Sequence, residues 1–260
     1  AFLAQHQAKL GVPNCWVVGD PGFSRALGAA GFLGMILPKE VGGHARHPLE
    51  RYVVIEELLA AGAPVGAHWI ADRQTAPLIL RYGSEEAKAA YLPGICKGEI
   101  YTCIGLSEPG AGSDLAAVRT AARHTSEGWR ISGQKIWTSG AHMSHVMLAL
   151  VRSEEGSERN AGLSQFLIPM DAPGITKQQI HKIGMNSSDT AQLFFDNVRV
   201  PKRNLIGQEG LGFTFQMLQF QEERQWGAAS SLRGLDRLID STIEYTRARQ
   251  AFGKSILDNQ

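Results

Sequence analysis

The most informative part of the sequence reads Ser107-Glu108-Pro109-Gly110-Ala111-Gly112-Ser113-Asp114-Leu115. Its two isolated glycines let a ligand approach the backbone closely, and Ser107 and Ser113 offer hydroxyls beside backbone N–H groups. This composition is typical of a cradle for a phosphate or for the polar edge of a ring, and also of an ordinary Gly-Pro turn. The stretch is neither a P-loop nor a Rossmann fingerprint, because the residues that define those two motifs are missing.

The residues before this stretch are predicted to be helical. Apolar residues recur at helical spacing over Glu50–Ala63, and Pro64 ends that segment. Ser84, followed by two glutamates, is typical of a helix start, and the helix would run to about Cys96. We expect residues 1–100 to form an amino-terminal helical domain that is entered partway through a helix.

A run of short segments rich in β-branched and aromatic residues begins near residue 100. Because Gly, Ser, Asn and Pro separate them, they predict a small antiparallel barrel or sandwich over residues 101–206. Pro201 would end its last strand. The predicted strands are Val118–His124, Trp129–Ile131, Lys135–Trp137, Val146–Val151, Leu163–Ile168 and Gln192–Val200.

Helical periodicity returns after Gly210, so that the order of the whole chain is α, then β, then α. We expect residues 207–260 to begin a second helical domain, the rest of which lies outside this sequence. An apolar stripe on this last segment has no partner layer before residue 260. The stripe is formed by Leu232, Leu235, Ile239 and Ile243.

Composition excludes several classes of protein. The 260 residues are 43% hydrophobic and 20% charged, a balance that supports a packed core. A net charge of +1 leaves no basic field for nucleic acid, and no apolar run approaches the roughly 18–20 residues that span a bilayer. Three cysteines without metal-type spacing fit a reducing compartment and no metal site. We therefore expect a soluble intracellular protein.

A second motif reads Lys135-Ile136-Trp137-Thr138-Ser139-Gly140. The Trp137 indole could stack on a flat aromatic ligand while the Ser139 hydroxyl binds the edge of that ligand. A core tryptophan at the end of a strand is the alternative interpretation.

A third motif reads Gln219-Phe220-Gln221-Glu222-Glu223-Arg224, within the last predicted helical region. Adjacent carboxylates point about 100° apart on a helix, so at most one of Glu222 and Glu223 can face a given pocket. A carboxylate desolvated by apolar neighbours, such as Phe220, Trp226 and Gly227 here, becomes a stronger base. A solvated Glu-Glu-Arg face is the alternative.

These motifs, in this order and spacing, resemble the acyl-CoA dehydrogenase family. Two further matches are Asp196-Asn197-Val198-Arg199-Val200-Pro201 and Arg249-Gln250-Ala251-Phe252-Gly253-Lys254. The sequence around Ser187-Ser188-Asp189-Thr190-Ala191 is most similar to that of bacterial citronellyl-CoA dehydrogenases. The resemblance implies an α+β fold: an amino-terminal helical domain, a middle β domain and a carboxyl-terminal helical bundle, with FAD between the last two.

The resemblance also implies which residues hold FAD. Leu106 and Ser107 match positions at the pyrimidine edge of the flavin, whereas Trp137 and Ser139 match positions that pack on the ring and bond near N5. Three matched positions contact FAD across a subunit interface in the family, which implies a homodimer or homotetramer. They are Arg249, Phe252 and Gln260.

The substrate residues follow from the same matches. Ser113 and Arg224 match residues that hold the CoA thioester in the family. Asn160 matches such a residue more weakly. Glu223 falls where isovaleryl and long-chain members carry the catalytic base, although most members carry it in a part that this sequence lacks. Asn186 departs from the family pattern, in which an arginine is common after Gly-Met.

The implied reaction is FAD-dependent α,β-dehydrogenation of an acyl-CoA to the trans-2-enoyl-CoA. Electrons would pass to an electron-transferring flavoprotein. An oxygen-using acyl-CoA oxidase or flavin monooxygenase, and a non-catalytic FAD-binding homologue, stay open as alternatives. The expected location is the cytoplasm of a bacterium, or the mitochondrial matrix of a eukaryote.

Overall fold

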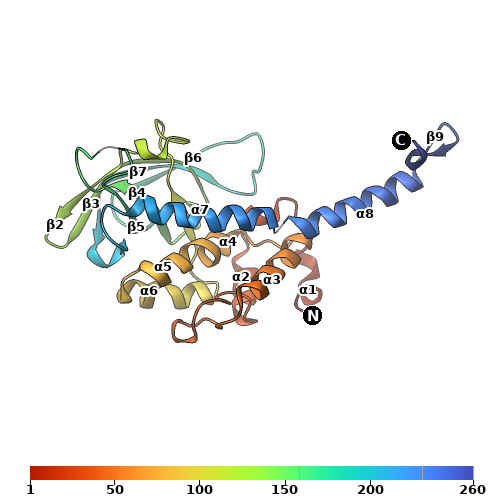
Figure 1. Ribbon diagram of the computed structural model, residues 1–260, viewed down its shortest axis with the longest axis horizontal. Helices are drawn as coiled ribbons and strands as arrows, with labels where there is room; N and C mark the ends of the chain where they lie inside the picture. Colours follow the sequence, from red (N-terminus) through yellow and green to blue (C-terminus); the bar gives the residue numbers. More distant parts are fainter. Residues whose placement is uncertain (158, 230, 260) are drawn as a thin grey trace.

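The computed structural model describes residues 1–157, 159–229 and 231–259, except for the side chains of residues 222, 225, 226 and 229. The first strand begins at Thr102, and the described residues before it form helices joined by turns and loops, as predicted (Figure 1). Six of these helices are α-helices. They are α1 (Phe2–Gln5), α2 (Pro21–Ala29), α3 (Pro48–Ala60), α4 (Gly66–Ile70), α5 (Ala76–Tyr82) and α6 (Glu85–Cys96).

Local capping explains where the longer of these helices begin. The Ser84 hydroxyl accepts a hydrogen bond from Ala87 N at 3.0 Å, and α6 ends at Cys96, so both predicted ends of this helix are confirmed. The Asp20 carboxylate caps α2 in the same way, through Phe23 N at 2.9 Å. These caps satisfy backbone N–H groups that the first turn of a helix leaves without partners.

A π-helical turn, Ala71–Thr75, joins α4 to α5, and all of its residues are buried. The Asp72 carboxylate within it accepts a hydrogen bond from Gly34 N at 2.6 Å, which fixes the loop after α2 against this turn. Such turns are rare and frequently occur at functional sites.

The middle of the chain is one sheet of the order β6-β7-β3-β2-β4-β5-β8, with β1 also paired to β4. Most pairings are antiparallel, as expected, whereas β4 pairs in parallel with β1 and β2. The strands are β1 (Thr102–Gly105), β2 (Ala121–Thr125), β3 (Gly128–Ser139), β4 (Val146–Arg152), β5 (Leu163–Pro169), β6 (Ile175–Gln179), β7 (Thr190–Pro201) and β8 (Leu205–Ile206).

Two details of the strands differ from the sequence prediction. Trp129–Ile131 and Lys135–Trp137 belong to the single strand β3, because irregularities in register let it stay paired with β7 along its length. The short strand β1 and the largely polar strand β6 lack the apolar pattern that predicts a strand. Pro201 ends β7, as predicted.

Strand β4 lies at the centre of the core. Val146 and Leu148 share a core cluster with residues of α5 and α6, and Leu150 belongs to a smaller cluster with Leu115 and Val118. Met147, Ala149 and Val151 belong to the core on the other face of the sheet. Because both faces are covered, β4 reads as a continuous apolar run rather than an alternating one.

The last helices, α7 (Gly212–Ala229) and α8 (Leu232–Ala248), lead to a small hairpin of β9 (Gln250–Ala251) and β10 (Lys254–Ser255). Figure 1 shows α7 beside the sheet and the amino-terminal helices, and α8 projecting beyond them. The predicted apolar stripe on α8 is exposed: Leu232, Leu235, Ile239 and Ile243 are 56%, 50%, 56% and 38% exposed. Within the described residues, no helix combines the length and apolar character needed to span a bilayer.

Candidate active site

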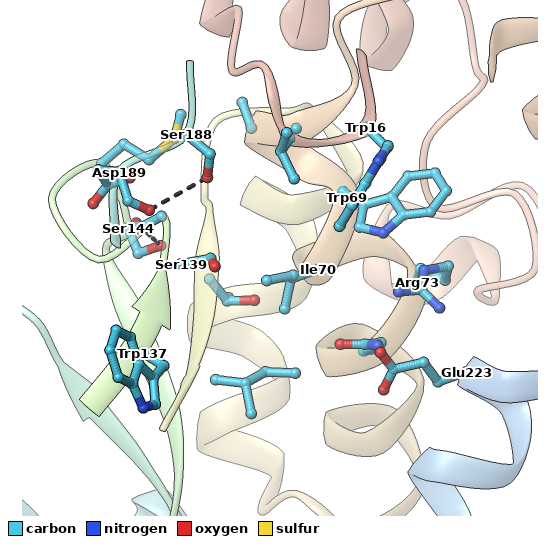
Figure 2. Close-up of a pocket in the computed structure, with 18 of the residues that line it drawn as sticks. Trp16, Trp69, Ile70, Arg73, Trp137, Ser139, Ser144, Ser188, Asp189 and Glu223 are labelled. Carbon is cyan, nitrogen blue, oxygen red and sulfur yellow. Dashed lines mark hydrogen bonds between the residues drawn. The ribbon is translucent and has the colours of Figure 1, made fainter. Parts of the chain in front are cut away.

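A cavity of about 300 Å³, here cavity A, lies where the amino-terminal helices, the sheet and α7 meet (Figure 2). Each of these three regions contributes to its wall. The main lining residues are Trp16, Trp69, Ile70, Arg73 and Gln74 from the first region, Leu106, Trp137, Ser139, Ser188 and Asp189 from the second, and Phe220 and Glu223 from α7.

Trp137 lies at an irregularity of β3 that aims its side chain at cavity A. The pairing with β7 skips from Lys135 to Thr138, and Trp137 has a φ of 62° and a side chain that is 61% exposed. A bulky residue in the left-handed region is strained, and such strain persists where the surroundings impose it, often at a ligand site. The fold therefore presents an exposed indole to the cavity.

The segment before Trp137 is tied to the glycine-rich loop. Ile136 N donates a hydrogen bond to Ser107 O at 2.9 Å, so the second motif of the sequence and the first lie side by side. Glu108 and Ala111 close a tight turn through two backbone hydrogen bonds of 2.8 and 3.0 Å. The two motifs consequently form one unit at the edge of the cavity.

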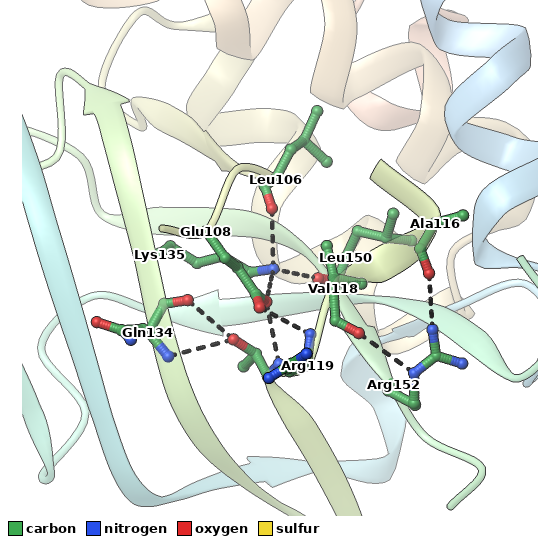
Figure 3. A network of polar contacts seen from close by, with 10 residues as sticks. Leu106, Glu108, Ala116, Val118, Arg119, Gln134, Lys135, Leu150 and Arg152 are labelled. Carbon is green, nitrogen blue, oxygen red and sulfur yellow. Dashed lines mark hydrogen bonds and ion pairs between the residues drawn. The ribbon is translucent and has the colours of Figure 1, made fainter. Parts of the chain in front are cut away.

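A buried ion pair fixes this unit from behind (Figure 3). Lys135 Nζ donates to Glu108 Oε1 at 2.8 Å, to Leu106 O at 3.0 Å and to Leu150 O at 2.6 Å. The Glu108 carboxylate also accepts from Arg119 N at 2.7 Å and from Thr120 N at 3.0 Å. The network joins the loop to strands β3 and β4, so it holds Leu106 where it lines the cavity.

The environment changes the pKa of both members of the pair. Burial lowers the pKa of the Lys135 ammonium to about 8, while Glu108 acts in the opposite direction. Burial alone would raise the pKa of Glu108, but the charge and hydrogen bonds of Lys135 and Arg119 N outweigh it, so its pKa lies below the ordinary value. The carboxylate is thus held in its charged form.

A second anchored loop forms the wall beside Ser139. Ser139 pairs with Thr190 across β3 and β7, and Gly140 N donates to Asp189 O at 3.1 Å. The Asp189 carboxylate accepts from His142 N at 2.9 Å and lies 2.8 Å from His142 Nδ1. These contacts fix the loop that carries the exposed Ser139 hydroxyl.

Glu223 faces cavity A from α7, opposite Trp137 and Ser139 (Figure 2). Its side chain is half-buried and also lines a second cavity of about 750 Å³, here cavity B. The same wall contains Arg73, whose guanidinium lies 4.7 Å from the centre of the Trp69 ring. A carboxylate therefore stands on the boundary between two cavities.

The structure brings together only part of the predicted site. Leu106, Trp137, Ser139 and Glu223 line cavity A, and Ser107 lies half-buried next to them. The remaining predicted residues in the described part of the chain are exposed and line neither cavity. They are Ser113, Asn160 and Arg224, together with Arg249 and Phe252 beyond α8.

Two of these outlying positions have informative surroundings. The Arg224 guanidinium lies 5.3 Å from the centre of the Phe220 ring, on the surface of α7. Phe252 is fully exposed in the hairpin, which Figure 1 shows far from the sheet. The predictions for Gln260, and for the side chains of Glu222 and Trp226, fall outside the described residues.

Sequence reasoning missed the contribution of the amino-terminal helices. Trp16, Trp69, Arg73 and Gln74 line cavity A, but nothing in their spacing distinguishes them from helix-core residues. Sequence reasoning also missed the role of Lys135 as the buried partner of Glu108. Lys135 lies within the second motif, directly before Ile136 and Trp137, and a lysine in such a strand is a signal from which a buried ion pair could be predicted.

Models of three consecutive domains match most of the chain. They are "Acyl-CoA dehydrogenase, N-terminal domain" over residues 16–99, the middle domain over residues 103–198 and the C-terminal domain over residues 210–260. The chain belongs to the acyl-CoA dehydrogenase family. Members of this family are FAD flavoproteins.

Individual acyl-CoA dehydrogenases agree with this assignment. The chain is 36% identical to acyl-CoA dehydrogenase IpdE1 of Mycobacterium tuberculosis, over 88% of this chain and 59% of that protein. It is 33% identical to the mitochondrial short-chain specific acyl-CoA dehydrogenase of Mus musculus, over 88% of this chain and 56% of that protein. The relatives thus include bacterial and mitochondrial proteins, and the chain spans little more than half of their length.

A solved structure shows the same fold. The crystal structure of acyl-CoA dehydrogenase from Geobacillus kaustophilus matches with a TM-score of 0.86 at 30% identity, over 94% of this chain and 66% of that chain. The expected mixed fold of amino-terminal helices, middle sheet domain and the start of a carboxyl-terminal helical domain is therefore confirmed.

Proposed function

We propose that the protein catalyses FAD-dependent α,β-dehydrogenation of an acyl-CoA thioester. The observation that carries this proposal is the placement of Glu223 across one cavity from Trp137 and Ser139. A carboxylate on one side and a ring-binding surface on the other are what the reaction needs, since a proton and a hydride must leave neighbouring carbons of one substrate.

The residues present fit a flavin. The exposed Trp137 indole offers a stacking face, and the Ser139 hydroxyl lies beside it on the cavity wall. In the described part of the chain, Gln74 Oε1 is buried without a hydrogen-bond partner, and Gln74 lines the same cavity. A Cβ added to Gly110 or Gly112 would meet no described atom within 4 Å, so the loop leaves its backbone open to a ligand.

Glu223 would act as the general base. A bound flavin supplies the acceptor for the hydride that leaves the β-carbon. Glu223 takes the proton from the α-carbon, and its place on the cavity wall near Phe220 leaves it half-buried. Positioned general bases contribute about 10²–10⁴-fold to such steps.

The proposed CoA contacts lie outside cavity A. Ser113, Arg224 and Asn160 are exposed, which suits the long polar part of a CoA thioester that extends from the cavity to the surface. We assign them to this role on the strength of their matches to the family motifs.

A second copy of the chain would complete the FAD site. Arg249 and Phe252 lie in the hairpin beyond α8, away from the cavity of their own chain. With Gln260, they would contact the FAD of a neighbouring subunit, so we propose a homodimer or homotetramer. The hydrophobic stripe on α8 is consistent with further contacts in the assembled protein.

The test uses the protein at its full natural length. Mass spectrometry of the extracted cofactor should identify FAD, and mostly FMN would contradict the assignment. Anaerobic addition of an acyl-CoA should then bleach the flavin absorbance, and the bleached protein should reoxidise slowly in air but rapidly with an electron-transferring flavoprotein. Fast reoxidation in air would indicate an oxidase, and no bleaching with any acyl-CoA would indicate a non-catalytic homologue.

A further inference from the structure

Cavity B adjoins cavity A. Trp16, Trp69, Arg73 and Glu223 line both cavities, and cavity B continues between the loop at Gly11 and helices α7 and α8. Its volume of about 750 Å³ falls within the roughly 300–1,000 Å³ of pockets that enclose whole drug-sized ligands. A molecule that reacts beside Glu223 can therefore extend well beyond cavity A.

Glycine residues from separate parts of the chain line cavity B. Gly11 and Gly62 form one side, where Gly11 N donates to Ala61 O at 2.9 Å and Val12 N donates to Gly62 O at 3.0 Å. A Cβ on Gly62 would lie 2.8 Å from Gly11 Cα, so close packing of the two segments requires glycine there. Gly234 of α8 also lines cavity B and presents no side chain to it.

Two tryptophan side chains lie where the two cavities adjoin. The Trp16 indole is 46% exposed, and the Trp69 ring has the Arg73 guanidinium over one face. An indole offers a large, rigid apolar surface on which a ring can pack. The volume of cavity B and the two indoles in its lining favour a ring over a narrow alkyl chain.

The reaction geometry places the two parts of a substrate. The α-carbon of a thioester lies between its carbonyl group and the rest of its acyl group, so the base must stand where these parts meet. Glu223 stands on the boundary of the two cavities. The carbonyl end then belongs in cavity A, near Trp137 and Ser139, and the body of the acyl group belongs in cavity B.

We propose that the acyl group of the substrate carries a ring system, which binds in cavity B against Trp16 and Trp69. This inference rests on the proposed function and adds the substrate class. Gly234 is the best position at which to test whether a ring binds in cavity B. A Cβ there would meet no described atom within 4 Å, so a larger side chain can be introduced and would occupy the cavity.

The experiment compares three thioesters on the full-length enzyme: butyryl-CoA, octanoyl-CoA and 3-cyclohexylpropanoyl-CoA. We expect kcat/KM for the ring-bearing thioester to exceed that for octanoyl-CoA by at least ~10-fold. Gly234→Leu should lower kcat/KM for the ring-bearing thioester at least ~10-fold relative to butyryl-CoA. Ser241→Leu, an exposed position on the same helix that lines neither cavity, is the matched control and should behave as the parent.

Each outcome decides the inference. FAD content and thermal unfolding of the variants show whether Gly234→Leu is folded, and direct binding of the three thioesters gives the same comparison without turnover. Equal use of octanoyl-CoA and the ring-bearing thioester, or an equal loss of all three in Gly234→Leu, would overturn the proposal. Failure of every thioester to reduce the flavin would instead contradict the proposed function itself.

Discussion

The Lys135 ammonium lies 2.8 Å from the Glu108 carboxylate, in a position where the lysine side chain is fully buried. The same ammonium binds the carbonyl oxygens of Leu106 and Leu150, so it has a hydrogen-bond acceptor for each of its protons. Burying two charges costs several kcal/mol each unless both are fully partnered. The pair is therefore a positioning device for the loop at the edge of cavity A.

Lys135→Met should destabilise the protein by about 3–5 kcal/mol, because it leaves the Glu108 charge buried without its cation. Chemical unfolding would measure this. The control is Lys88→Met, which removes an exposed ion pair with Glu85 of similar length, 2.7 Å, and should cost about 0–1 kcal/mol. Comparable losses in the two variants would show that burial is not what makes the first pair important.

The pKa of Lys135 predicts how the contribution of this residue to the free energy of unfolding depends on pH. The folded protein has this pKa at about 8, below the ordinary value of 10.5, so between these pH values the unfolded chain binds the proton that the folded chain has released. Stability from this group must then rise with pH across that window. The difference in unfolding free energy between the parent and Lys135→Met should carry this slope, and a difference independent of pH would contradict it.

His68 predicts sensitivity to acid. It is buried with Nδ1 2.8 Å from Ser24 Oγ, and burial lowers the pKa of its imidazole from 6.5 to about 3. Between those values the unfolded chain binds one more proton, so stability falls as the pH falls, by up to about 1.4 kcal/mol per pH unit. His68→Gln retains a polar partner for Ser24 but cannot titrate. Its unfolding free energy should lose that slope in urea titrations between pH 6 and pH 4, and a slope equal to the parent's would refute the assignment.

The sequence predicts those helices and strands whose ends are determined by residues close to them in the chain. The cap at Ser84 and the stop at Pro201 could be read because each acts within a few residues. Strand β4 could also be predicted, because its apolar residues follow one another directly in the sequence. In contrast, the single strand β3 depends on pairing with β7 across irregularities of register, which the sequence of either strand does not reveal.

The residues of the candidate site also fall into a group that the sequence predicts and a group that it does not. Leu106, Trp137, Ser139 and Glu223 could be found through short motifs, whereas Trp69 in α4 and Gln74 in the π-helical turn line the cavity through the packing of the amino-terminal helices against the sheet. Side-chain direction after such a turn depends on tertiary contacts. No periodicity in residues 1–100 contains that information.

Trp137→Gly separates backbone strain from ligand binding. Glycine adopts a φ of 62° without a Cβ penalty, which for other residues is roughly 1–2 kcal/mol, so the variant should be as stable as the parent or more stable. Loss of the stacking face should weaken FAD binding by about 2- to 10-fold, the equivalent of about 0.5–1.5 kcal/mol. Fluorescence titration with FAD measures the affinity.

The control for this variant is Ala45→Gly, an exposed residue with a φ of 50° that lines neither cavity. It relieves the same backbone conformation at a site remote from the proposed flavin. FAD affinity should not change in this variant. If Trp137→Gly also binds FAD like the parent, the exposed indole is not part of the flavin site.

Glu223→Gln tests the proposed base directly. Glutamine retains the shape and hydrogen-bonding capacity of the side chain, so FAD content and thioester binding should stay at the parental level, whereas anaerobic flavin reduction should slow by about 10²–10⁴-fold. The shorter carboxylate of Glu223→Asp should recover part of the rate, because it restores a base on the same boundary between cavities A and B. Glu244→Gln, at an exposed position on α8, is the matched control and should reduce its flavin at the parental rate. Parental reduction by Glu223→Gln would place the base elsewhere in the full-length protein, because a side chain that cannot accept the α-proton cannot sustain that rate.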